Sequence, residues 1–309
     1  MKPFVGPDQR TMRVAGAHRL PGEQQNVSSH SSFQPRTSVD GVSMSEDNEP
    51  GRRRESFDAI ADAYSLYRPA PPIEVVDAVI ASSNLRQGSS VLEIGCGTGQ
   101  LSVPLAKHGV DLVAIELGSH LATLARRNLV EFSNARVEVG AFEEWQLPMH
   151  KFDAVVSANA FHWLDPAVRY SKSAEALRPE GFLTILHVHH VRGGTPGFFE
   201  DTQPYYIRWG LSDDPFFQPT APADVPTMYP ELDELQEFSS VERHRFEIPM
   251  RHSTASYVGW LRTDSLVNSL DDEARRGFLQ DIEQLIDSKY HGTVARDFVY
   301  DVTVARRAS

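Results

Sequence analysis

The residues best placed to do chemistry form a short glycine-rich run, VLEIGCGTGQLS, at residues 91–102. Three glycines stand at alternate positions, between an apolar stretch and the beginning of a helical pattern: Gly95, Gly97 and Gly99. Glycine adopts positive φ without steric cost, and its missing Cβ lets a ligand approach the backbone closely. The run therefore predicts a tight turn from a strand to a helix, with a nucleoside-type ligand resting on it.

The spacing of the glycines separates two kinds of ligand. A dinucleotide fingerprint has the spacing G-x-G-x-x-G/A and admits a pyrophosphate, whereas Gln100 stands here in place of the last small residue. Glu93, two residues before the first glycine, would repel a pyrophosphate and attract an ammonium group. The run resembles motif I of the class I S-adenosylmethionine (SAM) methyltransferases, E/D-x-G-x-G-x-G. This resemblance implies that SAM contacts Glu93, Gly95, Cys96, Gly97 and Gly99.

A second acidic residue, Glu116, ends the next apolar stretch. It follows the glycines by about 20 residues, the distance at which a Rossmann-like unit places the acid that binds the ribose hydroxyls. No Arg stands beside Glu116 to favour a 2′-phosphate. We therefore expect Glu116 and the neighbouring Leu117 to contact the cofactor, the alternative for Glu116 being a solvated strand end.

The segment at residues 136–145 reads as a third strand followed by a loop. In the resembling family this loop contacts adenine, so Phe142 is expected to stack on the ring and Glu143 to accept from the exocyclic amine. A packed aromatic residue and a surface acid are the alternatives for these two positions.

The fourth strand, at residues 152–160, has the near-continuous apolar character of a strand buried on both faces. Asn159 near its end is a further expected cofactor contact. The following string, FHWLD at residues 161–165, resembles the post-strand motif of the trans-aconitate methyltransferase-like and ubiquinone-methylase-like branch. His162 is the candidate catalytic residue because the pKa of histidine lies near neutrality, and a structural residue packed over the cofactor is the alternative.

Other segments extend the same resemblance. Residues 57–72 match the Y-x-x-YRP segment with which a family member covers the SAM pocket. The resemblance implies that Tyr64 and Arg68 reach the cofactor, with Arg68 pairing with a carboxylate, whereas local packing is the alternative. Later segments complete a likeness that spans roughly residues 55–307, namely residues 175–190, 257–265 and 298–307.

The string HVHH at the end of the fifth strand offers further candidate bases, His187, His189 and His190. Alternation along a strand puts His187 and His189 on one face and His190 on the other. A metal site is an alternative reading, but no Cys or Asp accompanies the string at ligand spacing. We therefore expect no metal.

After the fifth strand, residues 191–240 are punctuated by Gly and Pro around a helical stretch at residues 198–209. The family carries its substrate lid at this point, before the last two strands. The candidate acceptor contacts are mostly aromatic, and packing inside the lid is their alternative role: Trp163, His189, Tyr205, Trp209 and Arg262.

The order of these segments predicts the fold class. Helix and strand signals alternate from residue 73 to residue 190, which indicates βαβ units and a parallel sheet covered on both faces. We predict an α/β, Rossmann-like, seven-stranded and mostly parallel sheet with helices on both faces and a helical lid insertion before the last two strands. Residues 51–309 would form this domain, with ligands at the carboxyl ends of the strands.

Composition excludes several classes of partner. The chain has 309 residues and a net charge of −12, without the cluster of cations that a grip on phosphate backbones requires, so we expect no nucleic acid partner. No apolar stretch reaches about 18 residues, so we expect no membrane span. The one cysteine favours a reducing, cytoplasmic compartment. Residues 1–50 are rich in Ser, Pro, Gly, Gln and Asn and predict a disordered tail, with a targeting segment or an overlong gene model as alternatives.

The resemblance implies an enzyme that moves a methyl group from SAM to an oxygen or nitrogen, less so a carbon, of a small-molecule metabolite, as a monomer or homodimer. Two other functions stay open. One is a catalytically idle binding protein of the same fold, and the other is an NAD-type oxidoreductase, which Gln100 and Glu93 disfavour. No motif identifies the methyl acceptor.

Overall fold

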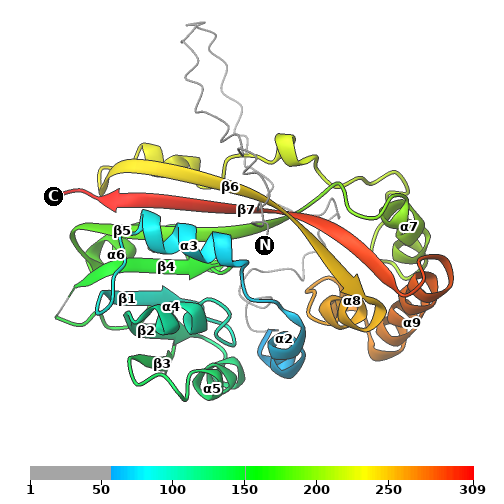
Figure 1. Ribbon diagram of the computed structural model, residues 1–309, viewed down its shortest axis with the longest axis horizontal. Coiled ribbons are helices and arrows are strands. Elements are labelled where there is room, and N and C mark those ends of the chain that lie inside the picture. The colour runs from blue at the N-terminus through cyan, green and yellow to red at the C-terminus, as the bar shows by residue number, and fades with distance from the viewer. Residues whose placement is uncertain (1–56, 150) are drawn as a thin grey trace, which may run out of the picture. The chain divides into compact units, whose positions relative to one another are not determined.

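A computed structural model describes residues 57–149 and 151–309, and a seven-stranded sheet forms the centre of this part of the chain (Figure 1). The predicted tail at residues 1–50 lies outside the described residues. The strands, in chain order, are β1 Ser90–Ile94, β2 Asp111–Glu116, β3 Ala135–Val139, β4 Phe152–Ala158, β5 Leu177–Val191, β6 Phe238–Ser253 and β7 Thr293–Arg307.

The strand order across the sheet is β3-β2-β1-β4-β5-β7-β6. Neighbours from β3 to β5 pair in parallel, whereas β7 pairs antiparallel with both β5 and β6. The chain moves outward from β1 to β3 and then returns to β4 on the other side of β1. This reversal opens a crevice at the carboxyl ends of β1 and β4, where open α/β sheets bind their ligands.

Helices cover both faces of the sheet, as predicted. Successive residues of β1 enter different cores: Val91 belongs to the hydrophobic cluster that contains the buried residues of α3, whereas Leu92 belongs to the cluster that contains those of α6. The helices are α2 Ala61–Tyr67, α3 Ile73–Ser82, α4 Ser102–His108, α5 Ser119–Asn128, α6 Arg169–Ala176, α7 Phe198–Arg208, α8 Thr254–Leu261 and α9 Asp272–Lys289. Figure 1 shows α7, α8 and α9 together at one end of the long strands β6 and β7.

The structure confirms the predicted α/β architecture and refines its details. Strand β5 begins at Leu177, inside the segment that the sequence assigns to a helix and a turn, because Phe152 of β4 pairs with Leu177 before the ladder shifts. The segment between β5 and β6 holds α7 and two short 3-10 helices, Pro222–Asp224 and Pro230–Asp233. No helix in the described ranges is both long and apolar enough to span a bilayer.

Candidate active site

A cavity opens at the carboxyl ends of β1, β2 and β4, the position that the topology favours. Eight of its lining residues carry sequence predictions: Tyr64, Gly95, Gly97, Glu116, Leu117, Phe142, Asn159 and Trp163. The sequence reasoning misses other lining residues, most of which are apolar side chains on strands, helices and loops around the cavity, and which include Phe57, Ile94, Ile115, Leu121, Ala158 and Leu164. Such residues carry no motif and look like ordinary core residues in the sequence.

The glycine loop is held against the end of β2 by hydrogen bonds. The backbone N–H groups of Gly95 and Cys96 donate to the Ile115 carbonyl oxygen, at 2.8 and 3.2 Å. The Gly97 N–H donates to Glu116 Oε2 at 2.8 Å, and the Gly118 N–H donates to Glu116 Oε1 at 2.9 Å. Both carboxylate oxygens of this residue are therefore fixed at the floor of the cavity.

Two of the glycines serve different purposes. Gly95 has a φ of 68°, and a Cβ there would lie 2.4 Å from Ala160 Cβ, so this glycine lets the loop pack against the end of β4. Gly97 has a φ of 58°, and a Cβ there would lie 3.5 Å from Tyr64 Cε1 and would face the cavity. The predicted tight turn is confirmed, and Gly97 keeps the wall of the cavity free of side chain.

The other predicted members of this motif do not line the cavity. Glu93 is 1% exposed and accepts a 2.6 Å hydrogen bond from the Ser102 hydroxyl at the start of α4. Burial raises the pKa of Glu93 to about 8. Cys96 and Gly99 are also buried, and burial raises the pKa of the Cys96 thiol well above its usual value. A thiol with a raised pKa is a poor nucleophile, so Cys96 fills space in the turn.

Phe142 and Glu143, the two predicted adenine contacts, have different surroundings in the structure. Phe142 is buried and lines the cavity, and the Lys172 ammonium lies 5.5 Å from its ring centroid. Glu143 is not among the lining residues, and its Oε1 accepts from the Asp165 N–H at 3.2 Å. The two predicted contacts therefore lie in one loop, but only Phe142 reaches the cavity.

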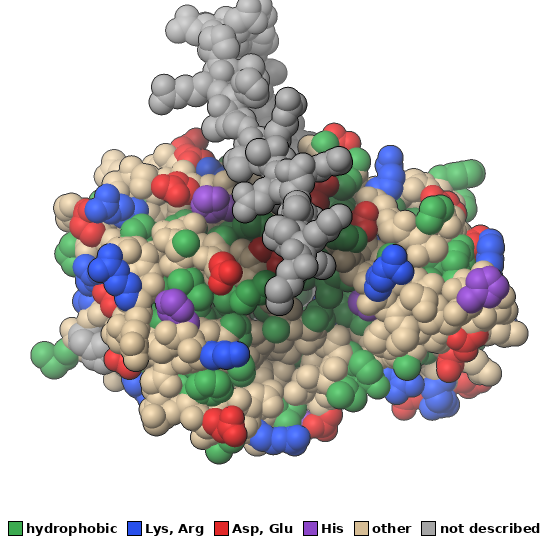
Figure 2. Space-filling model, in the orientation of Figure 1, with side chains coloured by type: hydrophobic (Ala, Val, Ile, Leu, Met, Phe, Trp, Pro, Cys, Tyr) green, Lys and Arg blue, Asp and Glu red, His purple; other side chains and the backbone are tan. Residues whose placement is uncertain are grey.

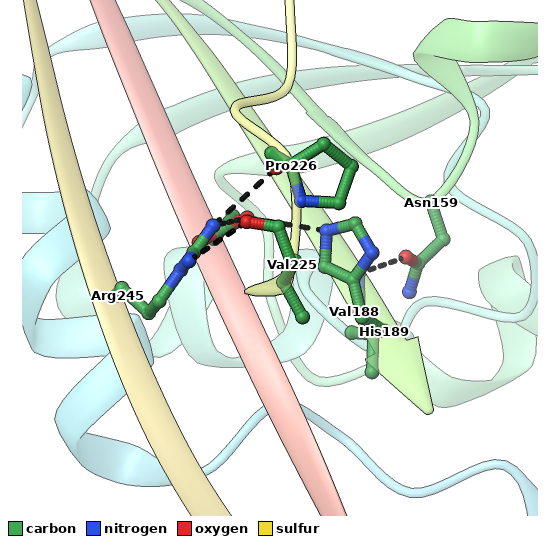
Figure 3. A network of polar contacts seen from close by, with 7 residues as sticks. Asn159, Val188, His189, Val225, Pro226 and Arg245 are labelled. Carbon is green, nitrogen blue, oxygen red and sulfur yellow. Dashed lines mark hydrogen bonds and ion pairs between the residues drawn. The ribbon is translucent and has the colours of Figure 1, made fainter. Parts of the chain in front are cut away.

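Asn159 joins the cavity to the centre of the sheet. Its φ of 53° is unusual for a residue other than glycine, although asparagine tolerates it best. Its N–H donates to the Leu186 carbonyl oxygen at 2.9 Å. Its Oδ1 accepts from the Val188 N–H at 2.9 Å (Figure 3). These bonds fix the direction in which the chain leaves β4 and enters the cavity wall.

The predicted N-terminal contacts lie on or just after helix α2. Tyr64 lines the cavity, and burial raises the pKa of its hydroxyl. Arg68 lies off the cavity wall and donates from Nε to Thr263 Oγ1 at 2.7 Å. Its guanidinium also lies 5.6 Å from the Tyr64 ring and 5.4 Å from the Trp260 ring. Arg68 therefore ties α2 to the end of α8.

The FHWLD string forms a 3-10 helix, Phe161–Trp163, directly after β4. Trp163 lines the cavity, whereas His162 turns away from it toward the ring of His187, 5.2 Å distant between centroids. Although part of His162 faces solvent, the protein around its ring removes much of its hydration. This desolvation, together with the charge of Arg169, lowers the pKa of His162 to about 4. The imidazole is neutral at pH 7.

The histidines of β5 divide between the two faces as predicted. His187 and His189 share one face, with ring centroids 4.6 Å apart, whereas His190 packs between Trp260 and Phe298 on the other. His189 Nε2 lies 3.1 Å from Asp301 Oδ2. The described residues contain no group of three or more His, Cys, Asp or Glu side chains arranged to hold a metal ion.

The structure brings few of the predicted acceptor contacts to the cavity. Trp209 donates from its indole nitrogen to Asp281 Oδ2 at 2.8 Å, which anchors the end of α7 on α9. Tyr205 packs against the core, and Arg262 is exposed at the C-terminal end of α8. Of the five candidate acceptor contacts, only Trp163 lies on the cavity wall.

Comparisons with known proteins agree with this architecture. Residues 91–181 match a family model described as a methyltransferase domain. An uncharacterized methyltransferase of Mycobacterium tuberculosis is 34% identical over 131 residues, which cover 42% of this chain and 51% of the relative. The trans-aconitate 2-methyltransferase of Deinococcus radiodurans is 28% identical over 181 residues, which cover 55% of this chain and 66% of that protein. The chain thus spans about half the length of the first of these relatives and about two thirds of the second.

A solved structure shares the fold. The structure of a candidate type II methyltransferase from Anaeromyxobacter dehalogenans superposes with a TM-score of 0.56 and 19% identity, over 78% of this chain and 98% of that one. Together these comparisons confirm the predicted resemblance to the class I methyltransferases, with SAM as the cofactor of the matched domain.

Proposed function

We propose that this chain, whose residues 91–181 are a class I SAM-dependent methyltransferase domain, transfers a methyl group from SAM to an oxygen or nitrogen of a small-molecule acceptor. The observation that carries the proposal is the cavity formed by the glycine loop and Glu116 at the carboxyl ends of β1 and β2. The name of the trans-aconitate 2-methyltransferase relative also favours a small-molecule acceptor.

The residues of the cavity fit a SAM molecule. Glu116 is 8% exposed, and a carboxylate offers about four acceptor positions, so one side chain can hold the glycine loop and accept from ribose hydroxyls. Gly97 leaves the space that a side chain would fill beside Tyr64. Phe142 offers a buried aromatic face to a base. These three features match the ribose, the methionyl arm and the adenine of the cofactor.

When bound, SAM supplies a methyl group on a sulfonium, which a nucleophile attacks in line with the sulfur. The contribution of the chain is then mainly positioning, which can lower the barrier by about 7 to 11 kcal/mol. Aromatic side chains on the cavity wall, Phe57, Tyr64 and Trp163, would exclude water from the reacting atoms. No histidine lines the cavity in the described part of the chain, so the proposal does not depend on a protein base.

Calorimetry with S-adenosylhomocysteine tests the cofactor half of the proposal. S-adenosylhomocysteine is what remains of SAM after methyl transfer. We expect the full chain to bind it and Gly97→Val to lose this binding, because the added side chain would enter the cavity. Gly88→Val is the matched control, because Gly88 also has a positive φ, of 79°, but a Cβ there would have no neighbouring atom within 4 Å. The control would share the backbone strain and keep the affinity.

Methyl transfer itself is tested with radiolabelled SAM and a mixed metabolite extract. A labelled small molecule would support the proposed reaction, and mass analysis of the product would identify the methylated atom. Binding of S-adenosylhomocysteine without any labelled product would favour the idle binding protein. Absence of binding would overturn the cofactor assignment.

A further inference from the structure

One wall of the cofactor cavity is a short segment, residues 57–68, which we call the strap. It consists of α2 and the residues just before and after it. Phe57 and Tyr64 of the strap line the cavity with their rings 5.9 Å apart, and the Phe57 ring lies 6.3 Å from that of Trp163. Figure 1 shows α2 between α5 and α8, and it packs against both. In the same orientation, Figure 2 shows hydrophobic side chains at the centre of this face and many of the charged ones toward its edges.

The C-terminal end of the strap is joined to α8 by several contacts. Arg68 donates from Nε to Thr263 Oγ1 at 2.7 Å and from Nη2 to the Thr263 carbonyl oxygen at 3.2 Å. A Cβ at Gly259 of α8 would lie 2.2 Å from Tyr67 Cδ1, so this glycine makes room for the tyrosine ring. Detaching this end would therefore break the bonds of a guanidinium and open a packed contact.

Helix α8 is itself anchored on the sheet. Arg296 of β7 donates to the Tyr257 hydroxyl at 3.2 Å, and the Trp260 ring lies 6.2 Å from the ring of Phe298, also on β7. The Arg68 guanidinium lies 5.4 Å from the same Trp260 ring. The C-terminal end of the strap is thus joined to the sheet through α8.

The N-terminal end of the strap is held by Asp58. Its Oδ1 accepts from the backbone N–H groups of His120 and Leu121, at 2.8 and 2.9 Å, in the first turn of α5. The first N–H groups of a helix have no partner inside the helix. Gly118, the N-cap residue of α5, has no side chain to accept from them. The carboxylate of Asp58 therefore caps α5 from another part of the chain, where its charge also suits the helix dipole.

This cap connects the strap to residues of the cavity. Phe57, beside Asp58 in the chain, and Leu121, which donates to it, both line the cavity. The Gly118 N–H donates to Glu116 Oε1 at 2.9 Å, so the same turn holds the carboxylate assigned to the ribose. A Cβ at Gly118 would lie 2.5 Å from Asp58 Oδ1, so the cap forms only because residue 118 has no side chain.

We propose that Asp58 is a positioning residue that fastens the strap over the bound cofactor, and that the cofactor enters and leaves when this end of the strap detaches from α5. The proposal rests on the proposed methyltransferase function and states how its cofactor site opens. The two ends differ in what detachment costs. Water can replace Asp58 at the two N–H groups, because this carboxylate is only half-buried, whereas the Tyr67 ring would lose its packing at the other end.

Stopped-flow mixing of the full chain with S-adenosylhomocysteine tests the proposal. Tryptophan fluorescence is the readout, because Trp163 lines the cavity, and the dependence on ligand concentration gives the association and dissociation rate constants. We expect Asp58→Ala to raise the dissociation rate constant at least tenfold without slowing association, because the strap opens more often. Asp58→Asn keeps an oxygen that can cap the helix and should stay within about threefold of the parent rate.

Gly118→Ala breaks the same contact from the other side. The φ of −74° and ψ of 119° at Gly118 suit alanine, so the added Cβ displaces the Asp58 carboxylate without straining the backbone. This variant should also dissociate at least tenfold faster. The double variant with Asp58→Ala should dissociate no faster than Asp58→Ala alone, because both changes remove one contact.

Asp62→Asn is the matched control. It removes the same charge from the strap, but the Asp62 side chain is 81% exposed and lies 3.8 Å from His120 Nε2 in a surface ion pair. Because such pairs contribute little, this variant should keep both rate constants.

The failures of the two proposals are distinguishable. If the chain does not bind S-adenosylhomocysteine, the methyltransferase function fails. If it binds but Asp58→Ala dissociates at the parent rate, the fastening role of Asp58 is overturned. A lower melting temperature with an unchanged dissociation rate, or an affinity lost through slower association, would show that Asp58 only caps α5. If Asp58→Ala does not fold, the dissociation rate of Gly118→Ala decides, and the parent rate there overturns the proposal.

Discussion

At the scale of single residues, the carboxylate of Glu116 has the most constrained environment in the cavity. Its two oxygens accept from the backbone N–H groups of Gly97 and Gly118, so the residue fixes the loop as well as facing the ligand. The amide of Glu116→Gln would turn an NH₂ group toward one of these donors. We therefore expect Glu116→Gln to weaken both the hydrogen bonds that hold the glycine loop and the hydrogen bonds to the ribose.

The first prediction is that Glu116→Gln weakens binding of S-adenosylhomocysteine by about 1.5 to 3 kcal/mol, the range for hydrogen bonds to a charged group. Calorimetry measures this loss, and circular dichroism checks that the variant is folded. Glu144→Gln, at an exposed acid in the adjacent loop, is the control and should bind normally. Unchanged affinity in Glu116→Gln would contradict the ribose contact.

The second prediction concerns His162, whose ring faces His187 and whose pKa is lowered to about 4. Because it lies off the cavity wall, we expect it to shape the loop rather than accept a proton. His162→Asn should retain substantial turnover with an unchanged pH profile, whereas His162→Ala should weaken cofactor binding and turnover. A loss of about 10² or more in turnover for His162→Asn, with cofactor affinity unchanged, would indicate general base catalysis.

At the scale of elements, the sequence is most informative where motif and periodicity agree. The alternation of apolar runs and helical patterns predicts β1 to β5, and the glycine spacing predicts the turn after β1. Sequence reasoning does not locate strand β6, because Phe238–Ser253 carries no motif and lies outside the segments that match the family. It also misses helix α9, although the Asp271 cap and the spacing of Phe278, Ile282 and Ile286 carry a helical signal.

The site is predictable only where its residues share a local motif. The loop glycines, Glu116 and Trp163 lie in recognisable strings, and the structure places most of them at the cavity. By contrast, Arg68 and Arg296 are separated by more than two hundred residues, and each contacts α8, Arg68 at the Trp260 ring and Arg296 at the Tyr257 hydroxyl. The sequence points to Arg68 and to Arg262, which is exposed, but not to Arg296. The spacing of residues along the chain does not show which distant charged side chains the fold brings to the same helix.

The third prediction tests how α7 docks on α9. A Cβ at Gly277 would lie 2.2 Å from Trp209 Cη2, so this glycine makes room for the indole. In an open helix, Gly to Ala stabilises by about 1 kcal/mol, but here overpacking should destabilise by about 1 to 3 kcal/mol. Denaturant unfolding measures the difference. Gln280→Ala, on the exposed side of α9, is the control, and a more stable Gly277→Ala would contradict the observed packing.

At the scale of the whole molecule, buried titratable groups make stability depend on pH. The pKa of His187 is lowered to about 3, mainly by burial, and the pKa values of His190 and His252 are also lowered, again mainly by burial. Below the unfolded pKa of 6.5 the unfolded chain binds these protons more readily, so stability falls as the pH decreases. Glu93, with a pKa raised to about 8, acts oppositely, because its neutral form favours folding until the pH rises through that value.

The fourth prediction is that the melting temperature is highest near pH 6.5 and falls toward pH 4.5, since the three desolvated imidazoles of His187, His190 and His252 outweigh one carboxyl in this window. In His187→Leu the melting temperature should fall less steeply from pH 6.5 to pH 4.5, because His187 is 6% exposed and its Nδ1 has no partner in the described structure. Scanning calorimetry between pH 4.5 and 7.5 measures the slope. His120→Leu, at an exposed histidine, should keep the parent slope. If the melting temperature of His187→Leu falls as steeply with decreasing pH as that of the parent protein, this imidazole is not kept neutral by burial. The loss of stability in acid then arises from other groups.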